Sequence, residues 1–159
     1  KIHPFSFGGE DAHYDGGDAL PTAEIDGVRV TPLICYDLRF PEPFRAAAER
    51  TDLFVVIASW PAARRTHWST LLAARAIENQ AYVLGVNRIG EGDGLVYEGD
   101  SVLHDPWGGV VATASDGVDA ANAAPAGLVV GAVDAAVVAK ARARLSALKD
   151  RRRDVYETL

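Results

Sequence analysis

Apolar residues recur along the chain in short β-branched runs that alternate with segments of helical spacing. Trp68, Leu71, Leu72 and Ala76 lie three or four positions apart, which predicts an amphipathic helix over residues 64–80. Two further helices are predicted at residues 41–50, which open with prolines, and at residues 135–148. The β-branched runs predict six strands, at residues 28–34, 53–59, 82–87, 101–104, 110–113 and 128–133.

The connections between these elements are marked by Gly, Asp and Pro. Residues 6–24 show no period and predict a long loop, and residues 114–127 predict a surface loop. Turns are predicted at residues 26–27 and 91–94, and residues 105–109 predict a hairpin connection. Strands and helices alternate, so the chain is expected to form an α/β layered architecture with a mixed sheet. Pro32 indicates that its strand lies partly at an edge or a bulge.

Composition narrows the class of protein. The chain has 159 residues, is 48% hydrophobic and carries a net charge of −6, which suits one domain with a core and disfavours a nucleic-acid partner. The basic segment 140–153 is better explained as a solvated helix face or a subunit contact. No apolar run approaches the ~20 residues that a membrane helix needs. A single cysteine excludes an internal disulfide and favours a reducing, cytoplasmic location.

Cys35 is the clearest candidate for a reactive residue. It ends the strand at 28–34 and precedes the helix at 41–50, where partial positive charge and free N–H groups favour a thiolate nucleophile. The N–H of Tyr36 would then be placed to donate to an oxyanion. Composition alone favours the other interpretation, a buried structural cysteine.

The residues around Cys35 resemble the nucleophile segment of the nitrilase superfamily. That segment reads Leu33-Ile34-Cys35-Tyr36-Asp37-Leu38-Arg39-Phe40-Pro41-Glu42. Further motifs follow the superfamily's order, namely Lys1-Ile2-His3, Trp60-Pro61, His67-Trp68, residues 74–80, Gly99-Asp100-Ser101 and Asp105-Pro106-Trp107-Gly108. The pattern is most similar to the omega-amidase branch, which hydrolyses 2-oxo-dicarboxylic acid monoamides such as 2-oxoglutaramate.

The resemblance implies a Glu–Lys–Cys triad. Cys35 matches the nucleophile, and Lys1 matches the lysine that stabilises the tetrahedral oxyanion. The superfamily's general-base glutamate is expected upstream of Lys1, so residues 1–159 alone are expected to be inactive. Glu10 matches a second glutamate that is held near the lysine and the substrate; a solvated loop carboxylate is the alternative.

Other side chains are expected around the nucleophile. Tyr36 and Trp60 match walls of the substrate pocket, although Trp60 could equally be a core residue. Arg39 could hold a substrate carboxylate, but a structural role in the corner through ion pairing and N–H capping, shared with Asp37 and Glu42, is favoured. Arg75 and Glu78, three positions apart on the predicted helix, are expected to form a buried pair.

The fold implied by the resemblance is a four-layer α-β-β-α sandwich that assembles into homo-oligomers. Residues 1–159 would be the C-terminal part of a single carbon-nitrogen hydrolase domain, lacking its N-terminal portion. The implied activity is hydrolysis of a small, carboxylate-bearing amide to an acid and ammonia through a cysteine thioester, without a cofactor. The four histidines show no metal-ligand spacing, so no metal is expected.

Three alternatives stay open at this stage. Cys35 could work with a histidine base, His67 or His104, because such pairs meet in space rather than in sequence. The chain could be a non-catalytic or complementing subunit that keeps the fold. The activity could also belong to another branch of the superfamily, that of nitrilases or of N-carbamoyl amine hydrolases.

Overall fold

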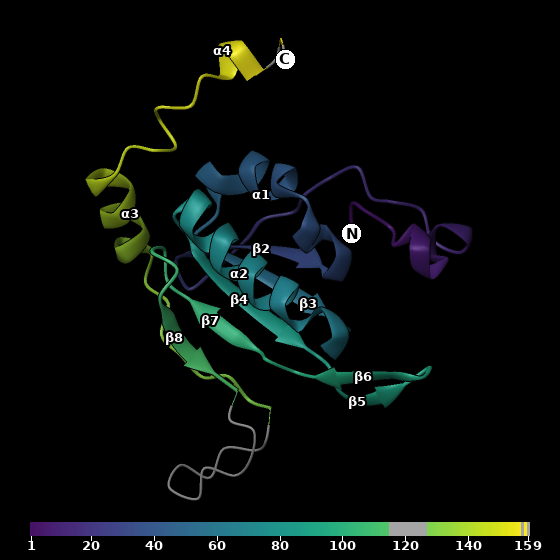
Figure 1. The fold of residues 1–159 in the computed structure, drawn as a ribbon. Coiled ribbons are helices and arrows are strands. Elements are labelled where there is room, and N and C mark those ends of the chain that lie inside the picture. Colours follow the sequence, from purple (N-terminus) through teal and green to yellow (C-terminus); the bar gives the residue numbers. More distant parts are fainter. Residues whose placement is uncertain (115–126, 157, 159) are drawn as a thin grey trace, which may run out of the picture.

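The centre of the molecule is a mixed six-stranded sheet in the order β1-β2-β3-β4-β7-β8 (Figure 1). The computed structural model describes residues 1–114, 127–156 and 158. Strands β2, β3 and β4 run parallel, and the outer neighbours pair antiparallel. The strands of this sheet are β1 (Ala23–Ile25), β2 (Val28–Ile34), β3 (Leu53–Ala58), β4 (Tyr82–Asn87), β7 (Val102–His104) and β8 (Val110–Thr113). A separate two-stranded ribbon, β5 (Ile89–Gly92) and β6 (Leu95–Glu98), extends beyond the carboxyl end of β4 (Figure 1).

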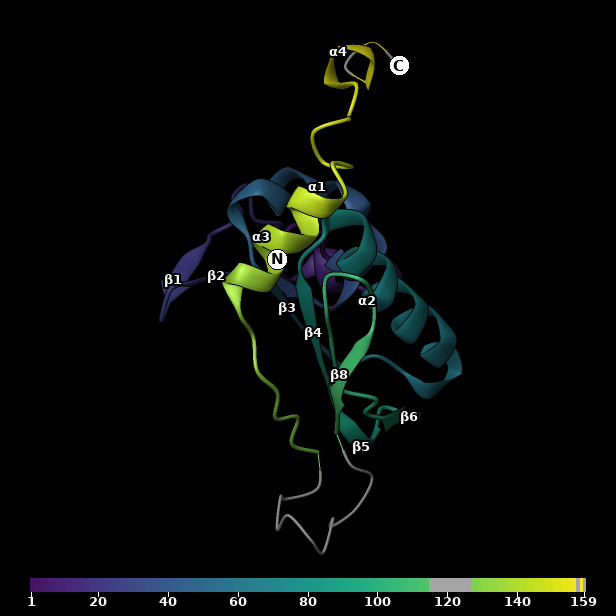
Figure 2. The same cartoon turned by 90° about the vertical axis from the view of Figure 1, so that its left-hand side faces the viewer.

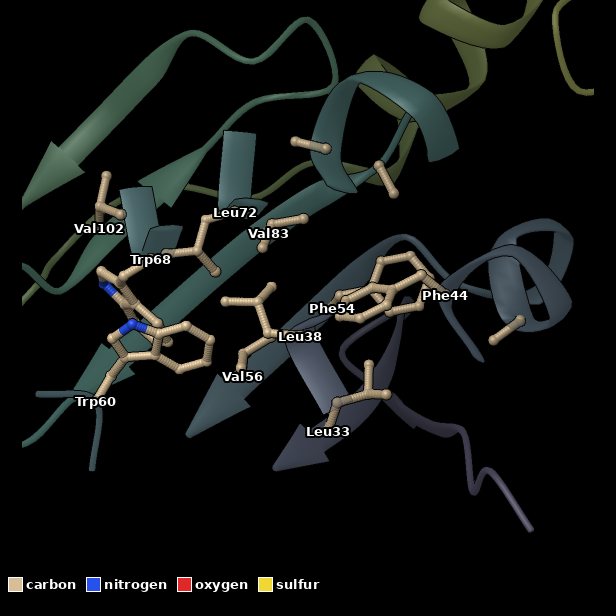
Figure 3. Packing of buried hydrophobic residues seen from close by; sticks show 13 residues of the cluster. Leu33, Leu38, Phe44, Phe54, Val56, Trp60, Trp68, Leu72, Val83 and Val102 are labelled. Atoms are coloured by element: carbon tan, nitrogen blue, oxygen red, sulfur yellow. The ribbon is translucent and has the colours of Figure 1, made fainter. Parts of the chain in front are cut away.

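Helices α1 (Pro41–Ala47) and α2 (Arg65–Asn79) cover one face of the sheet and close the main core. Phe54 and Val56 of β3 point into this core, where Phe54 lies beside Phe44 of α1 and Val56 beside Leu38, and Leu72 and Trp68 of α2 belong to the same cluster (Figure 3). At Gly85 a Cβ atom would lie 2.4 Å from the nearest carbon of Leu72, so α2 packs directly on the backbone of β4. This packing fixes the carboxyl ends of the parallel strands relative to one another.

The remaining helical elements are short. They are α3 (Ala135–Arg144), α4 (Arg153–Tyr156) and the 3-10 turns η1 (Ser6–Gly8), η2 (Glu10–Ala12), η3 (Cys35–Arg39), η4 (Ala48–Arg50) and η5 (Ala62–Arg64). Asp134 caps α3 by accepting the N–H of Ala136 at 2.7 Å. The chain ends with α4, which projects away from the body of the molecule (Figure 1).

The opposite face of the sheet is apolar and only partly covered. A second cluster, built on Tyr82, Leu103 and Val138, lies where α3 and the segment before it approach the sheet. That segment lies on the side opposite α2 (Figure 2). Elsewhere Ile34, Ile57 and Val86 remain between 37% and 49% exposed. The expected mixed α/β architecture is confirmed, and this face is where the resemblance implies a second sheet.

The strand predicted at residues 128–133 is wrong. No strand is present there, and a Cβ at Gly131 would lie 2.8 Å from Leu103 and 3.4 Å from Ala112. Val129 and Val133 pack against the second cluster. The segment therefore lies on the side chains of the sheet instead of hydrogen-bonding along its edge, and burial of alternate residues explains the strand-like pattern.

Three short strands were not predicted. β1 overlaps the end of the loop predicted at residues 6–24, and it pairs with β2 across the turn at Asp26-Gly27. β5 and β6 pair across Asp93-Gly94, so the predicted turn is right but its flanking strands were missed. In both turns the two central residues have positive φ, as hairpin turns of two residues require.

The other predicted elements are confirmed with small shifts of boundary. The last helix ends at Arg144 rather than at residue 148, and the 41–50 helix closes with the 3-10 turn η4. Pro32 lies past the last pair between β2 and β1, so its missing N–H faces an edge, as predicted. The predicted 114–127 loop lies almost entirely outside the described residues.

Candidate active site

Cys35 stands at a strained corner between β2 and η3. Its φ of 49° is in the left-handed region, which a non-glycine residue adopts only when the surrounding structure holds it there. Its Sγ lies 4.0 Å from the carbonyl oxygen of Ser59, at the end of the neighbouring parallel strand. The nucleophile candidate is therefore at the carboxyl edge of the sheet, where α/β proteins commonly bind ligands.

The environment of Cys35 corrects one expectation. Burial raises the pKa of the Cys35 thiol, and the hydrogen bond with Ser59 and the charge of Lys1 only partly oppose this rise. The sequence had predicted a lowered pKa from a helix N-terminus. The turn that follows Cys35 is instead a five-residue 3-10 turn, and α1 begins only at Pro41. A thiol with a raised pKa needs a base to become a nucleophile at neutral pH.

Lys1 and Glu10 are brought together as an ion pair beside this corner. Lys1 Nζ donates to Glu10 Oε2, and the same oxygen accepts the N–H of Phe5 at 2.9 Å. The hydrogen bond from Lys1 is the main reason that the pKa of Glu10 is lowered. Glu10 is thus an engaged, ionised carboxylate, which suits a residue that holds the lysine in place.

Asp37 connects the lysine segment to the cysteine corner. This carboxylate is fully buried and accepts the N–H groups of Ile2 at 3.1 Å, His3 at 2.8 Å and Ile34 at 3.0 Å. His3 Nδ1 also lies 3.0 Å from the carboxylate. The expected N–H capping role of Asp37 is confirmed by the hydrogen bond from Ile34. The hydrogen bonds from residues 2 and 3 to the same carboxylate were not predicted.

The other predicted corner residues differ in their surroundings. The ring of Tyr36 packs against Phe5, with centroids 4.8 Å apart, and lines the cleft beside Cys35. Glu42 is exposed in the first turn of α1 and forms no ion pair within residues 1–114, 127–156 and 158. Arg75 and Glu78 form the expected pair at 2.9 Å, with the Arg75 side chain buried.

Trp60 is both a core residue and a wall of the cleft. Its indole packs 5.6 Å from that of Trp68, and Arg39 places its guanidinium 4.7 Å from the ring centroid of Trp60. The Asn87 side chain accepts the Trp60 N–H at 2.7 Å and donates to the Trp60 carbonyl at 3.1 Å. Sequence analysis missed Asn87; its position as a polar residue at the end of a buried strand was the available signal.

One cleft of about 630 Å³, at the carboxyl ends of β2 and β3, is lined by the predicted site residues Lys1, Glu10, Cys35, Tyr36, Arg39 and Trp60. The ribbon β5–β6 forms part of its wall, which the sequence analysis missed together with the contributions of Phe5 and Arg64. Asp93-Gly94 between short apolar runs was the signal for the ribbon. The residues that line the cleft are Lys1, Phe5, Gly8, Glu10, Ile34, Cys35, Tyr36, Arg39, Ile57, Ala58, Ser59, Trp60, Pro61, Arg64, Asp93, Leu95 and Tyr97.

The histidines proposed as alternative bases do not line this cleft. His67 lies 3.4 Å from Arg39 on the exposed side of α2, and His104 is buried beside the carbonyl of Gly108 at 3.1 Å. Among the described residues there is no group of three His, Cys, Asp or Glu side chains that could hold a metal ion. No helix in the described part of the chain is long and apolar enough to cross a membrane.

Comparison with known proteins agrees with this geometry. Residues 2–143 match the carbon-nitrogen hydrolase family model. The chain is 50% identical to the omega-amidase YafV of Escherichia coli K12 over 115 residues, covering 72% of the chain and 44% of that protein. It is 34% identical over 157 residues to the 2-oxoglutaramate amidase of Bacillus subtilis, covering 98% of the chain and 58% of that protein. The chain therefore spans about half the length of the curated relatives it matches.

Solved structures show the same fold. XC1258 from Xanthomonas campestris, a CN-hydrolase superfamily protein with an arsenic adduct in its active site, superposes with a TM-score of 0.80 at 39% identity, covering 95% of this chain and 57% of that one. A double mutant of the amidase from Nesterenkonia sp. AN1, in complex with acrylamide, gives a TM-score of 0.77 at 28% identity, covering 99% of this chain and 54% of that one. The chain belongs to the carbon-nitrogen hydrolase family.

Proposed function

We propose that the protein containing this chain is a thiol amidohydrolase that cleaves a small, carboxylate-bearing amide of the 2-oxoglutaramate type to an acid and ammonia. One observation carries the proposal. Lys1 and Glu10 of the N-terminal segment and Cys35 of the corner after β2 line a single cleft at the carboxyl edge of the sheet. The relatives named omega-amidase and 2-oxoglutaramate amidase support this substrate class.

In the first half-reaction, Cys35 Sγ attacks the amide carbonyl carbon and its proton passes to a carboxylate base. The ammonium of Lys1 and the N–H of Tyr36 stabilise the oxyanion that forms. Tyr36 is the second residue of η3, and the first N–H groups of such a turn have no partner within it. The C–N bond then breaks, and the base returns the proton to the departing ammonia.

In the second half-reaction, water attacks the thioester with help from the same base, which releases the acid and regenerates the thiol. Glu10 is poorly suited to be that base, because Lys1 and the Phe5 N–H already occupy its Oε2. We therefore assign the base to the glutamate that the resemblance implies upstream of the lysine. The protein is further proposed to act in the cytoplasm as a homo-oligomer.

The test uses the complete protein and measures ammonia release from 2-oxoglutaramate. Cys35→Ala should abolish turnover while the circular dichroism spectrum and the thermal midpoint stay close to those of the unaltered protein. With the unaltered protein, quenching during turnover should trap an acyl adduct on Cys35 detectable by mass spectrometry. Retained turnover in Cys35→Ala would refute the proposal, and preference for a nitrile or an N-carbamoyl amine would move the protein to another branch.

A further inference from the structure

The cleft carries an excess of positive charge once internal pairing is considered. Its charged lining residues are the cations Lys1, Arg39 and Arg64 and the carboxylates Glu10 and Asp93. Lys1 and Glu10 neutralise each other. Asp93 is exposed at the tip of the β5–β6 ribbon. The two arginines are therefore the cations available to an anionic ligand.

These two arginines are held differently. The guanidinium of Arg39 stacks over Trp60 at 4.7 Å, and its Nη1 lies 3.4 Å from His67 Nδ1. Arg64 is half-buried, and its guanidinium has no hydrogen bond or ion pair with any residue of the described part of the chain. Other arginines in the fold do have such partners, for example Arg29 with Asp52 at 2.7 Å.

The backbone of Arg64 is nevertheless fixed beside the cleft. Its N–H donates to the Pro61 carbonyl at 2.9 Å, and its own carbonyl accepts the Trp60 indole N–H at 2.9 Å. Its positive charge is also close enough to act on Cys35, where it weakly opposes the rise in pKa of the thiol. Arg64 is thus an anchored residue whose guanidinium is free to bind an anion inside the cleft.

We propose that Arg64 is a specificity-determining residue that binds the carboxylate of the substrate, which lies at the opposite end of the substrate from the amide. This inference rests on the proposed function. A guanidinium presents paired donors that match the two oxygens of a carboxylate, and an unpaired, half-buried guanidinium has the most to gain from such a ligand. Arg39, whose face is covered by Trp60, then serves as part of the pocket wall.

The test compares an amide that carries the carboxylate with an otherwise identical amide that lacks it. The first is 2-oxoglutaramate, and the second is 4-oxopentanamide, in which a methyl group replaces the carboxylate. In the complete protein, Arg64→Ala should lower kcat/KM for 2-oxoglutaramate by about 10- to 100-fold, mainly through KM, since a hydrogen-bonded charge contributes ~1.5–3 kcal/mol. Turnover of 4-oxopentanamide should change little, and added guanidinium ion should partly restore turnover of the acid.

The matched control is the neighbouring Arg65→Ala. Arg65 lies outside the lining of the cleft and pairs with Glu98 at 2.9 Å and Asp100 at 2.6 Å. The Arg65→Ala variant should leave the ratio of kcat/KM for 2-oxoglutaramate to kcat/KM for 4-oxopentanamide unchanged. An Arg64→Ala variant that affects both amides equally or neither, or loss of discrimination only in Arg39→Ala, would overturn the inference. If the unaltered protein hydrolyses neither amide, the proposed function itself fails and takes this inference with it.

Discussion

The two regions that meet in the cleft are held by different kinds of interaction. Cys35 follows β2, an interior strand between β1 and β3, so sheet hydrogen bonds and the buried Leu33 and Leu38 determine where the thiol lies. Residues 1–12 form only 3-10 turns and contribute no buried residue. They are attached to the body through the carboxylate of Asp37 and through ring contacts of His3 with Phe40 and of Phe5 with Tyr36. The position of the proposed nucleophile is therefore a property of the sheet, whereas that of Lys1 depends on individual side chains.

Removing the lysine should break the site most severely while leaving the sheet untouched. Lys1→Ala in the complete protein should lower kcat by ~100-fold or more, the usual effect of losing one oxyanion donor. Steady-state ammonia release from 2-oxoglutaramate measures this. Lys140→Ala, an exposed lysine on α3, is the control and should keep the original kcat. An unchanged kcat in Lys1→Ala would show that the ammonium takes no part in catalysis.

Loosening the connection between the two regions should have the next largest effect. Asp37→Asn removes the charge that accepts several N–H groups, so we expect a loss of ~1–3 kcal/mol in the free energy of unfolding. Because the lysine segment is then less firmly held, kcat should fall by about 10-fold. Hydrogen exchange at the N–H groups of Ile2 and His3 should accelerate.

Asp52→Asn is the matched control for this variant. Asp52 is another buried carboxylate, paired with Arg29 at 2.7 Å, and it lies at the opposite end of β3 from the cleft. Asp52→Asn should lower the free energy of unfolding to a similar extent as Asp37→Asn, without changing kcat or the hydrogen exchange of residues 2 and 3. Equal losses of kcat in the two variants would mean that Asp37 acts only through overall stability.

The Lys1–Glu10 pair should matter less, because it is partly exposed. Glu10→Gln should lower kcat by no more than about 5-fold, since such pairs contribute up to ~1 kcal/mol. Asp11→Asn, the adjacent exposed carboxylate, should have no effect. A loss of about 1000-fold or more in Glu10→Gln, which is within the range expected for removal of a general base, would instead identify Glu10 as the base.

The pH dependence of this pair follows from the lowered pKa of Glu10. A carboxylate with a lowered pKa in the folded state contributes stability above its unfolded pKa and loses it as the pH falls through the folded value. Exchange at the Phe5 N–H, expressed relative to the intrinsic exchange rate at each pH, should therefore stay constant from neutral pH down to the ordinary pKa of a glutamate and increase only below it. An increase that begins near neutral pH would show that the pair does not hold this segment.

The smallest effect concerns the reactivity of the resting thiol. Because burial raises the pKa of Cys35, the thiolate fraction at a given neutral pH is lower than that of free cysteine. Iodoacetamide should accordingly label Cys35 more slowly than free cysteine near pH 7, and the rate should rise with pH into the alkaline range. Lys1→Ala should slow labelling further, since the lysine charge opposes the rise in pKa. Labelling at the rate of free cysteine would contradict this.

The pattern of apolar residues predicted the parallel strands and the helix α2 because their interiors are long and periodic. It missed β1, β5 and β6, which have only three or four residues each and bury few side chains. It placed a strand at residues 128–133 because alternate burial looks the same whether a segment pairs along a sheet edge or lies across its face. Only the position of Gly131 against Leu103 distinguishes the two.

The sequence by itself determined the family, the corner that carries Cys35, and the residue types that chemistry there requires, because each depends on a short stretch of chain. Only the tertiary structure decided which distant groups meet. It joined Asp37 to residues 2 and 3, paired Arg65 with Glu98, and left Arg64 facing the cleft with no partner among the residues that the structure describes. The physical reason is that periodicity reports which face of an element is buried, whereas pairing and burial of charge depend on how separate elements pack.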